Sequence, residues 1–254
     1  KYQDQEHRDV FLLTGVEDLV PETGKDGRHH SMNKRWKGED YHVIRYKPRI
    51  EQAFSRIEHW AKEKSGETHW RVISKQNVTQ IYGDSAKHRI VDPEQSDRVY
   101  SWLLSRTYDD KGNLVVYEYK QEDRANVREH VYEQNRNVSA NRYIKRIYYG
   151  YQTPYEAAKG TLPEDWHFQV VFDYGEHSES QPAVEEETLW DSRIDAFSTY
   201  RSRFEIRTLR RCRRILMFHR FDELGEEPCL VRSTDFTYSD GKANETDYVS
   251  LSFL

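Results

Sequence analysis

The sequence predicts a mainly β fold, with antiparallel sheets of short strands and hairpins, long polar loops and one or two short helices. Apolar and aromatic residues alternate strictly with other residues from Trp166 to Tyr174, which is the period of a β-strand. Residues 99–107 and 113–120 form two strand-like runs around a short turn, where Gly112 supplies the positive φ that hairpin loops need. Before this hairpin, short runs rich in β-branched and aromatic residues recur at intervals of roughly ten residues.

The first part of the chain is less regular than the rest. Residues 1–40 are charged and rich in turn residues, and within them only residues 10–13 suggest a strand. We therefore expect residues 1–40 to be a poorly regular lead-in. The strands predicted next are 41–51, 54–60, 69–74 and 78–82.

After the hairpin, the pattern predicts one short helix and two polar loops. Val127 and Val131 are spaced i, i+4, which favours one or two helical turns within residues 123–136. A strand follows at residues 143–149. The predicted loops are 154–163, for which a helical turn at 156–159 is an alternative, and 176–187.

The strand from Trp166 to Tyr174 has the clearest register. A slip by one residue would turn its five apolar or aromatic side chains to the wrong face, so we expect this register to be firmly fixed. In a later strand, Ile206 lies on one face and Arg207 on the other, so both faces of the sheet are used. The last predicted strands are 204–208, 215–221, 230–238 and 248–253.

Composition predicts a thin aliphatic core and excludes several classes of protein. Leu, Ile, Val and Phe make up only about a fifth of the residues, while 18 Tyr and 6 Trp supply amphipathic rings. The 39 basic and 44 acidic side chains give a net charge of −5, which argues against a general nucleic-acid-binding surface. No apolar stretch approaches membrane-spanning length. We expect Cys212 and Cys229 to be free thiols.

Seven arginines between residues 201 and 214 are the strongest local feature. Because guanidinium groups match carboxylates, we expect Asp173 and Glu176 to pair with arginines of this cluster. The favoured interpretation is a structural network, and a docking surface and a phosphate-binding site are the alternatives. The predicted network residues are Asp173, Glu176, Arg201, Arg203, Arg207, Arg210, Arg213 and Arg214.

No pattern in the sequence predicts catalysis. Glycine-rich phosphate loops and the HExxH, CxxC and GxSxG motifs are absent from it. The adjacent His29 and His30 would point to opposite faces of a strand, so they are expected to be loop residues. For His177 and His219 a structural hydrogen bond is favoured over a ligand role. We therefore expect no enzymatic activity, no cofactor and no metal site.

Six blocks of the chain carry a family pattern in collinear order. They are FLLTGVEDLVP (11–21), YKPRIEQAFSRIEHW (46–60), WLLSRTYDDKGNLVVYEYKQED (102–123), NRYIKRIYYGYQTP (141–154), FDYGEH (172–177) and RFEIRTLRRCRRILMFH (203–219). Together they resemble the N-terminal region shared by the Salmonella virulence-plasmid B protein (SpvB) and the B component of insecticidal toxin complexes (Tc toxins). Two departures are Arg211, where the family pattern has Leu, and the absence of the glycine-rich segment that opens the family's domain. We therefore expect residues 1–254 to belong to one domain that begins upstream.

The resemblance implies a mechanical role. In that family the domain adds β-sheet to the wall of a hollow shell that, with the C component, encloses a toxic polypeptide for delivery. The implied partners are the downstream propeller and RHS-repeat regions, the toxin C component and, indirectly, the A-component channel, with no nucleic acid and no membrane insertion. The implied location is outside the bacterium, after a cytoplasmic stage before release.

Two other functions compete with this one. A stand-alone carbohydrate- or protein-binding β module of a secreted protein would line a shallow groove with its Tyr and Trp side chains. An enzyme is the third possibility, because the virulence-plasmid relative carries an ADP-ribosyltransferase in a separate C-terminal module. Such enzymes use an Arg, a Ser-Thr-Ser strand and a Glu-x-Glu pair, and here only Glu185-Glu186-Glu187 fits, within a polar loop.

Overall fold

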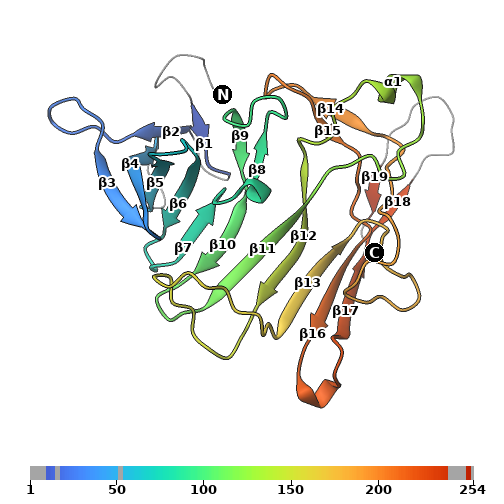
Figure 1. The fold of residues 1–254 in the computed structure, drawn as a ribbon. Helices are drawn as coiled ribbons and strands as arrows, with labels where there is room; N and C mark the ends of the chain where they lie inside the picture. Colours follow the sequence, from blue (N-terminus) through green and yellow to red (C-terminus); the bar gives the residue numbers. More distant parts are fainter. Residues whose placement is uncertain (1–9, 15–17, 51–53, 240–249, 253–254) are drawn as a thin grey trace. The chain divides into compact units, whose positions relative to one another are not determined.

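The computed structural model describes residues 10–14, 18–50, 54–239 and 250–252. It consists mainly of short antiparallel strands with few helices, so the predicted fold class is confirmed (Figure 1). Contacts divide the chain into two compact units: unit 1 contains Lys1–Val116 and Gln152–Glu164, and unit 2 contains Tyr117–Tyr151 and Asp165–Leu254. Two compact units can belong to one domain, so the assignment of residues 1–254 to a single domain stays a prediction.

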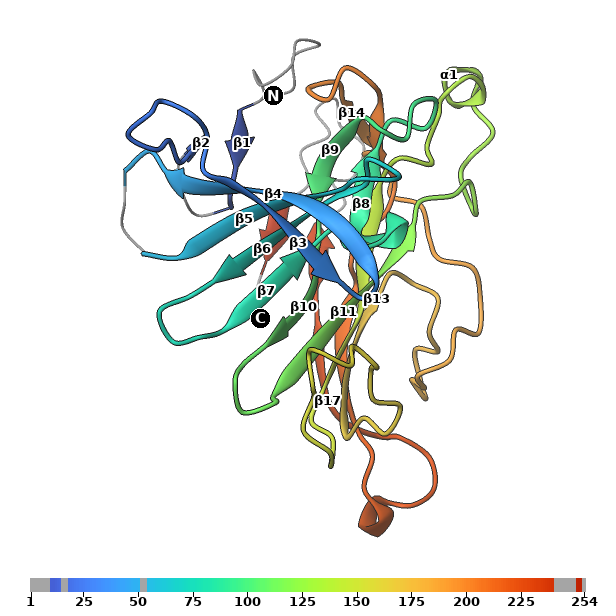
Figure 2. The same ribbon diagram turned by 60° about the vertical axis from the view of Figure 1, so that its left-hand side comes forward.

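Unit 1 is built from one long sheet and one short ladder. Its elements are β1 (Phe11–Leu12), β2 (Asp18–Pro21), β3 (Ser31–Trp36), β4 (Glu39–Pro48), β5 (Arg56–Lys62), β6 (Thr68–Ile73), β7 (Thr79–Tyr82), η1 (Ala86–His88), β8 (Arg89–Val91), β9 (Val99–Trp102), β10 (Leu104–Tyr108) and the start of β11 (Leu114–Gln121). The sheet order is β1-β2-β4-β5-β6-β7-β10-β11, with β3 paired to β4, while β8 and β9 form their own ladder (Figure 2).

The locally patterned strands of unit 1 lie close to where the sequence predicts them. Strands β4 to β7 match the four predicted runs, apart from residues 51–53, which lie outside the described residues. The predicted hairpin joins β10 to β11 through the pair Tyr108↔Leu114. Gly112 has φ +85 there, and a Cβ at this position would come within 2.7 Å of Pro154.

Two predictions for unit 1 are wrong. Residues 99–107 are not one strand, because the chain breaks at Leu103 into β9 and β10, which join different ladders. The described part of residues 1–40 is not an irregular lead-in either, because it contains β2 and β3 as well as β1. Strand β3 was hard to recognise because a lysine occupies one of its half-buried positions: Lys34 reaches the buried Glu58 at 3.0 Å.

The core of unit 1 is largely aromatic. One cluster buries Leu19, Ile57, Trp70 and Val72, with Phe11, Tyr46 and Trp102 packed against them. A second cluster contains Tyr41, Val43 and Trp60, covered by Met32 and Trp36. Ring pairs such as Phe11–Trp70, with centroids 4.9 Å apart, use the edge-to-face geometry that aromatic rings prefer. Amphipathic rings therefore supply the burial that the thin aliphatic content cannot.

Unit 2 is built around a second set of paired strands. Its elements are the end of β11, α1 (Val131–Gln134), β12 (Arg142–Tyr149), β13 (Phe168–Asp173), β14 (Phe197–Thr199), β15 (Ile206–Thr208), β16 (Arg214–His219), η2 (Asp222–Leu224), β17 (Cys229–Asp235), β18 (Thr237–Ser239) and β19 (Ser250–Ser252). The sheet runs β11-β12-β13-β16-β17, and β14-β15 and β18-β19 are two-stranded ladders. The predicted helix is the single turn α1, which Val131 begins and Val127 precedes.

The prediction for the face of β13 is wrong, although a strand is present. Gln169, Val171 and Asp173 are the buried positions, and the alternating apolar set that includes Phe168 is only half-buried. Val171 packs with Leu216, Phe218 and Val184. The opposite face is covered by ring contacts, including Phe168 stacked on Tyr149 with centroids 4.9 Å apart. Polar residues can occupy the buried face because they form hydrogen bonds and ion pairs there, as Asp173 does with Arg214.

The remaining strands of unit 2 are shorter than predicted. Residues 204–208 contribute only β15, and residues 230–238 are divided between β17 and β18. Residues 248–253 contribute β19, and the rest of that prediction lies outside the described residues. Cys212 and Cys229 are free thiols. Within the described ranges, the protein contains no helix long and apolar enough to span a bilayer.

Candidate functional site

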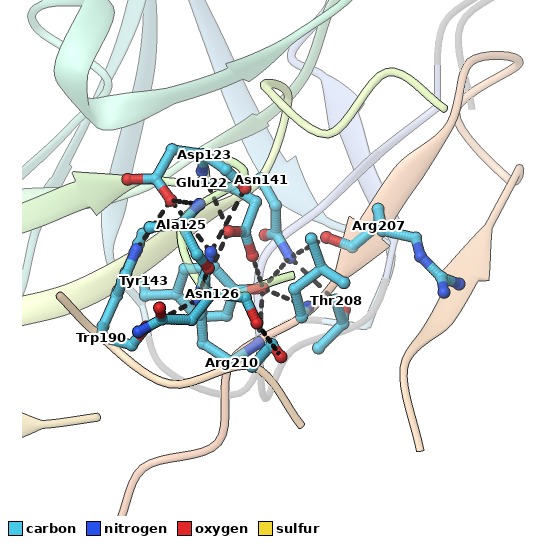
Figure 3. A network of polar contacts seen from close by, with 12 residues as sticks. Glu122, Asp123, Ala125, Asn126, Asn141, Tyr143, Trp190, Arg207, Thr208 and Arg210 are labelled. Carbon is cyan, nitrogen blue, oxygen red and sulfur yellow. Dashed lines mark hydrogen bonds and ion pairs between the residues drawn. The ribbon is translucent and has the colours of Figure 1, made fainter. Parts of the chain in front are cut away.

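Arg210 is the centre of a buried polar network in unit 2 (Figure 3). Its guanidinium and the Glu122 carboxylate are both fully buried, and Nε donates to Glu122 Oε1 at 2.8 Å. Nη2 donates to Asp123 Oδ1 at 2.9 Å, and Nη1 donates to the carbonyls of Ala125 and Trp190 at 2.8 and 3.1 Å. The guanidinium also lies 4.3 Å from the ring centroid of Trp190. Every nitrogen of this cation therefore has a partner.

Tyr143 joins the Arg210 network to the backbone after β15. Its hydroxyl donates to Glu122 Oε2 at 2.7 Å and accepts from the Leu209 amide at 3.0 Å. Burial raises the pKa of this phenol well above its ordinary value, and the neighbouring Glu122 charge acts in the same direction. Burial also raises the pKa of Glu122, opposed by Tyr143 and Arg210. The phenol thus stays protonated as a donor to the carboxylate.

Arg207 connects the network to α1. Its guanidinium forms a buried ion pair with Glu133, which lies in the helix, and Nη1 donates to Ser198 Oγ of β14 at 3.2 Å. Arg207 lies within β15, and Arg210 follows two residues after the strand ends at Thr208. This short segment therefore binds two different carboxylates, those of Glu133 and Glu122. A helix of four residues is too short to be stable alone, and this pair is one of its tertiary anchors.

Arg213 and Arg214 bind two further carboxylates. Arg214 Nε donates to Asp173 Oδ2 at 2.7 Å, as the charge argument expects, and Nη2 reaches the carbonyls of His177 and Ser178. Hydrogen bonds from Gly175 and Arg214 outweigh the effect of burial and lower the pKa of Asp173. Arg213 forms a more exposed pair with Asp191 at 2.7 Å.

Three predicted network residues have other environments. Glu176 does not pair with an arginine, because the buried Lys145 ammonium takes that role and also reaches His177 Nε2 at 2.8 Å. Arg201 and Arg203 lie in the exposed turn between β14 and β15. Arg201 forms no ion pair with a described residue, and Arg203 has φ +68. Both residues are exposed, and Arg201, which has no ion pair with a described residue, does not extend the network.

Sequence reasoning missed the main partners of the cluster. Glu122, Glu133, Tyr143 and Trp190 lie outside residues 201–214, and no local spacing connects them to this segment. Lys145, the partner of Glu176, was missed as well. Lys145 was the clearest available signal, since it lies among aromatic and branched residues in a strand. Burial lowers the pKa of its ammonium, and Glu176 opposes that effect.

The histidines and the acidic triplet have structural surroundings. His177 does make a structural hydrogen bond: its Nδ1 lies 2.9 Å from the Ala183 carbonyl. The expected hydrogen bond of His219 is missing at Nε2, which is buried without a partner, and the ring instead packs against Phe168 at a centroid distance of 4.8 Å. Glu186 of the exposed triplet pairs with Lys120 at 2.6 Å. His30 is exposed and lies 3.6 Å from Glu22.

The chemistry of this site is that of a fixed ionic support. Its charged groups are buried against one another, and burial raises the pKa of the nearby Cys212 thiol to about 12, so the reactive thiolate is disfavoured. Among the described residues, no group of three or more His, Cys, Asp or Glu side chains is arranged to hold a metal ion. What the geometry provides is one network of hydrogen bonds and ion pairs that joins the end of β11, α1, β15 and the segment around Trp190.

Sequence comparisons identify related proteins. The profile of the family described as Salmonella virulence plasmid 65kDa B protein, SpvB, matches residues 1–221. Mono(ADP-ribosyl)transferase SpvB of Salmonella typhimurium is 37% identical over 201 residues, which cover 76% of this chain and 34% of that protein. The protein of the same name from Salmonella enteritidis is 36% identical over the same coverage. The chain therefore spans about a third of the length of these curated relatives.

Solved structures share the fold over almost the whole chain. The N-terminal domain of effector protein SpvB from Salmonella typhimurium strain LT2 matches with a TM-score of 0.86 and 32% identity, covering 96% of this chain and 79% of that one. A Photorhabdus luminescens Tc holotoxin pore matches with a TM-score of 0.84 and 29% identity, covering 97% of this chain and 12% of that one. The crystal structure of TcdB2-TccC3 matches with a TM-score of 0.83 and 29% identity, with coverages of 95% and 12%. The resemblance predicted from six sequence blocks is confirmed.

Proposed function

Since this chain belongs to the family of the Salmonella virulence plasmid 65kDa B protein, SpvB, we propose that it is a non-catalytic structural segment of a bacterial toxin-complex B component. In this role its sheets form part of the wall of a shell that encloses a toxic polypeptide before delivery. The observation that carries the proposal is the match of 97% of this chain to part of a Tc holotoxin pore, in which it corresponds to 12% of a much longer chain.

The construction of unit 2 supports a load-bearing role. A wall needs sheets whose connections hold firmly, and Arg210 connects two carboxylates and two carbonyls from separate segments. Removing a buried charge from such a group leaves its partners unsatisfied, so the whole arrangement is kept or lost together. In unit 1, packed aromatic rings hold the strands together.

The absence of enzymatic activity is part of the proposal. The relatives named Mono(ADP-ribosyl)transferase are about three times as long as the matched region. The acidic triplet of this chain is exposed, and Glu186 is held by Lys120. Incubation with labelled NAD and a eukaryotic cell lysate should give no labelled protein above the background without this chain. Transfer of label that depends on Glu185 or Glu187 would overturn this part of the proposal.

The partners and the location follow from the same proposal. The segment would contact the downstream propeller and RHS-repeat regions of its own protein and the toxin C component, and it would meet the A-component channel only indirectly. It would bind no nucleic acid and would insert no segment into a membrane. It would act outside the bacterium, after assembly in the cytoplasm.

A chimera tests the wall function. The matching segment of TcdB2 is replaced by this chain, the chimera is produced together with TccC3, and the hypervariable C-terminal region of TccC3 is followed during limited proteolysis. We expect that region to be cleaved as slowly as in the unmodified complex. A matched control lacks the segment and should be cleaved quickly. A folded chimera that leaves the region as accessible as the control would contradict the proposal.

A further inference from the structure

Unit 2 exposes a group of large apolar side chains around α1 and β14. Val131 and Tyr132 of α1 are 81% and 62% exposed, and Phe197 and Tyr200 at β14 are 51% and 60% exposed. Ile194, on the segment leading into β14, is 67% exposed. These five residues are called the α1–β14 surface, and Figure 1 shows its two elements at the same corner of unit 2. Large apolar patches that remain in contact with water commonly mark binding sites.

Hydrogen bonds from one guanidinium join the two halves of this surface. Arg136 Nε donates to the Tyr132 carbonyl at 2.9 Å, and its Nη1 lies 3.4 Å from the Tyr200 hydroxyl. Arg136 therefore links the backbone of α1 to the Tyr200 hydroxyl directly after β14. The Phe197 ring lies 5.0 Å from the Arg193 guanidinium, which extends the surface toward Ile194.

Ion pairs fix the segments that carry the α1–β14 surface. Glu133 of α1 pairs with the buried Arg207, and Arg193 pairs with Asp195 at 2.6 Å. Arg136 pairs with Glu205 just before β15. These bonds orient exposed rings without burying them, so the surface is preorganised, and preorganisation lowers the ordering cost of binding.

The surroundings of this surface are basic, although the whole chain carries a net charge of −5. Arg124, Arg128 and Arg201 are exposed near its edges, and among the described residues none of them forms an ion pair. Arg124 donates instead to the carbonyls of Glu133 and Arg136, at the end of α1. The exposed acids of residues 123–136 are Asp123, which Arg210 binds, and Glu129. The local charge therefore favours a negatively charged partner.

An open cleft beside α1 extends this basic region. It has a volume of about 650 Å³, and its lining includes Arg124, Arg136, Gln134, Asn135 and Asn137. The carboxylates that also line it, Glu122 and Asp123, are already bound by Arg210. Guanidinium and amide groups are hydrogen-bond donors, which suits the cleft to an incoming carboxylate.

We propose that the α1–β14 surface and its cleft form a docking site for a protein segment whose apolar side chains are flanked by aspartate or glutamate. Aliphatic residues at Val131 and Ile194 favour a protein over a glycan, because sugar rings stack on aromatic faces and gain little from branched aliphatic side chains. The docking site goes beyond the wall function, which assigns no surface of this chain and no chemical character to any segment that it binds.

The test uses the complete chain and short synthetic peptides as probes. One peptide alternates Phe or Leu with Glu or Asp, a second replaces the acids by Lys, and a third replaces the apolar residues by Ser. Fluorescence anisotropy should show that the first peptide binds about tenfold more tightly than either of the others. Its affinity should fall as salt is raised, because exposed charges are screened.

Variants locate the binding to this surface. The double variant Tyr132→Ser/Tyr200→Ser should weaken the first peptide about tenfold, and Val131→Asp should weaken it by repulsion without disturbing the fold, since Val131 is 81% exposed. Arg124→Gln with Arg128→Gln should remove most of the salt dependence. The matched controls Leu224→Ser and Arg232→Gln alter an exposed apolar and an exposed basic residue elsewhere in unit 2 and should bind as the parent does.

Three outcomes would overturn the docking site. The Lys peptide could bind as well as the acidic one, which would remove the charge argument. The Val131→Asp variant, folded by circular dichroism, could bind the acidic peptide like the parent, which would place binding elsewhere. A neutral oligosaccharide could bind to the same side chains in preference to the peptides, which would identify a glycan surface. None of these outcomes affects the chimera test of the wall function.

Discussion

Two buried arginines, Arg71 in unit 1 and Arg210 in unit 2, have opposite kinds of partner, although unit 1 also buries Arg106 against the Asp84 carboxylate. In unit 1, the Arg71 guanidinium lies between two indole rings, 4.1 Å from the centroid of Trp36 and 3.6 Å from that of Trp60. In unit 2, Arg210 is bound by Glu122 and Asp123, with one indole, Trp190, beside it. One cation is thus held mainly by aromatic faces and the other by carboxylates.

The two surroundings have different electrostatic consequences. Burial lowers the pKa of Arg71 to about 10, and its Nη2 has no hydrogen-bond partner among the described residues. Its Nε donates to His69 Nε2 at 3.2 Å, and His69 is itself a neutral ring at neutral pH. The guanidinium of Arg210 has partners at every nitrogen. Arg71 therefore contributes mainly through packing against indole rings, and Arg210 contributes mainly through ion pairs that join separate segments.

The largest expected effect is the loss of a carboxylate from the joint in unit 2. Glu122→Gln keeps the size of the side chain but removes the charge that faces Arg210 and Tyr143. Breaking one side of a buried ion pair leaves the other charge uncompensated, so the free energy of unfolding should fall by about 3–5 kcal/mol. Urea denaturation followed by tryptophan fluorescence measures it. A loss below about 1 kcal/mol would contradict the conclusion that the buried Glu122–Arg210 pair stabilises unit 2.

Acid should weaken unit 1 through its buried histidines. Burial lowers the pKa of His69 to about 3 and that of His59 to about 4, so both rings are neutral in the folded protein. The unfolded chain takes up protons below about pH 6.5 while the folded chain does not, so stability is complete above that pH and declines below it. For His69 alone the loss between pH 7 and pH 4 should be on the order of 3 kcal/mol.

A substitution at His69 isolates this contribution to the pH dependence. His69→Gln retains an acceptor for Arg71 but cannot be protonated, so the unfolding free energy should depend less steeply on pH than in the parent. His29→Gln, at an exposed position, is the matched control and should leave the slope unchanged. Equal slopes for the parent and His69→Gln would contradict the assignment of a neutral buried ring.

A smaller effect is expected for the phenol in unit 2. Tyr143→Phe removes the donor to Glu122 and the acceptor for the Leu209 amide without creating a cavity. Two buried groups lose a partner, which should cost about 1–3 kcal/mol. Tyr148→Phe is the matched control, because its hydroxyl donates at 3.2 Å to the more exposed Glu118. Equal losses of unfolding free energy for the two variants in urea would contradict the claim that burial makes the Tyr143 hydrogen bonds more important for stability.

The smallest effect is expected where an ion pair is exposed. Glu156→Gln removes the partner of Lys159, and the two side chains are 59% and 71% exposed. Solvent screens such pairs, so the unfolding free energy should change by less than about 0.5 kcal/mol. A loss comparable with that of Glu122→Gln would show that burial is not what separates the two sites.

Local pattern explains which elements could be predicted from the sequence. The hairpin of β10 and β11 depends on residues close together in the chain, among them Gly112, and it was found. Strand β3 was missed because Lys34 fills a half-buried position, and the deeper face of β13 was misjudged because Asp173 is buried there. In both cases a distant partner, Glu58 or Arg214, makes a polar residue suitable for burial.

The candidate site likewise separates what local sequence shows from what depends on distant partners. The arginine-rich segment is visible in the sequence, and so is the need of its charges for carboxylates. The choice of Lys145 over an arginine as the partner of Glu176, and of Glu122 for Arg210, depends on which strands become neighbours. Charge complementarity predicts that partners exist, and only the fold selects them.

A matched pair of substitutions tests the contrast between the units most directly. Arg210→Met and Arg71→Met each replace a buried guanidinium by an apolar side chain of similar length, and unfolding in urea is measured for both. Arg210→Met should lose about 3–5 kcal/mol, because it leaves Glu122 buried and unpaired. Arg71→Met should lose only about 1 kcal/mol, since a thioether also packs well against indole rings and no carboxylate is left behind. Equal losses, or a greater loss for Arg71→Met, would contradict the distinction between an ionic joint and aromatic packing.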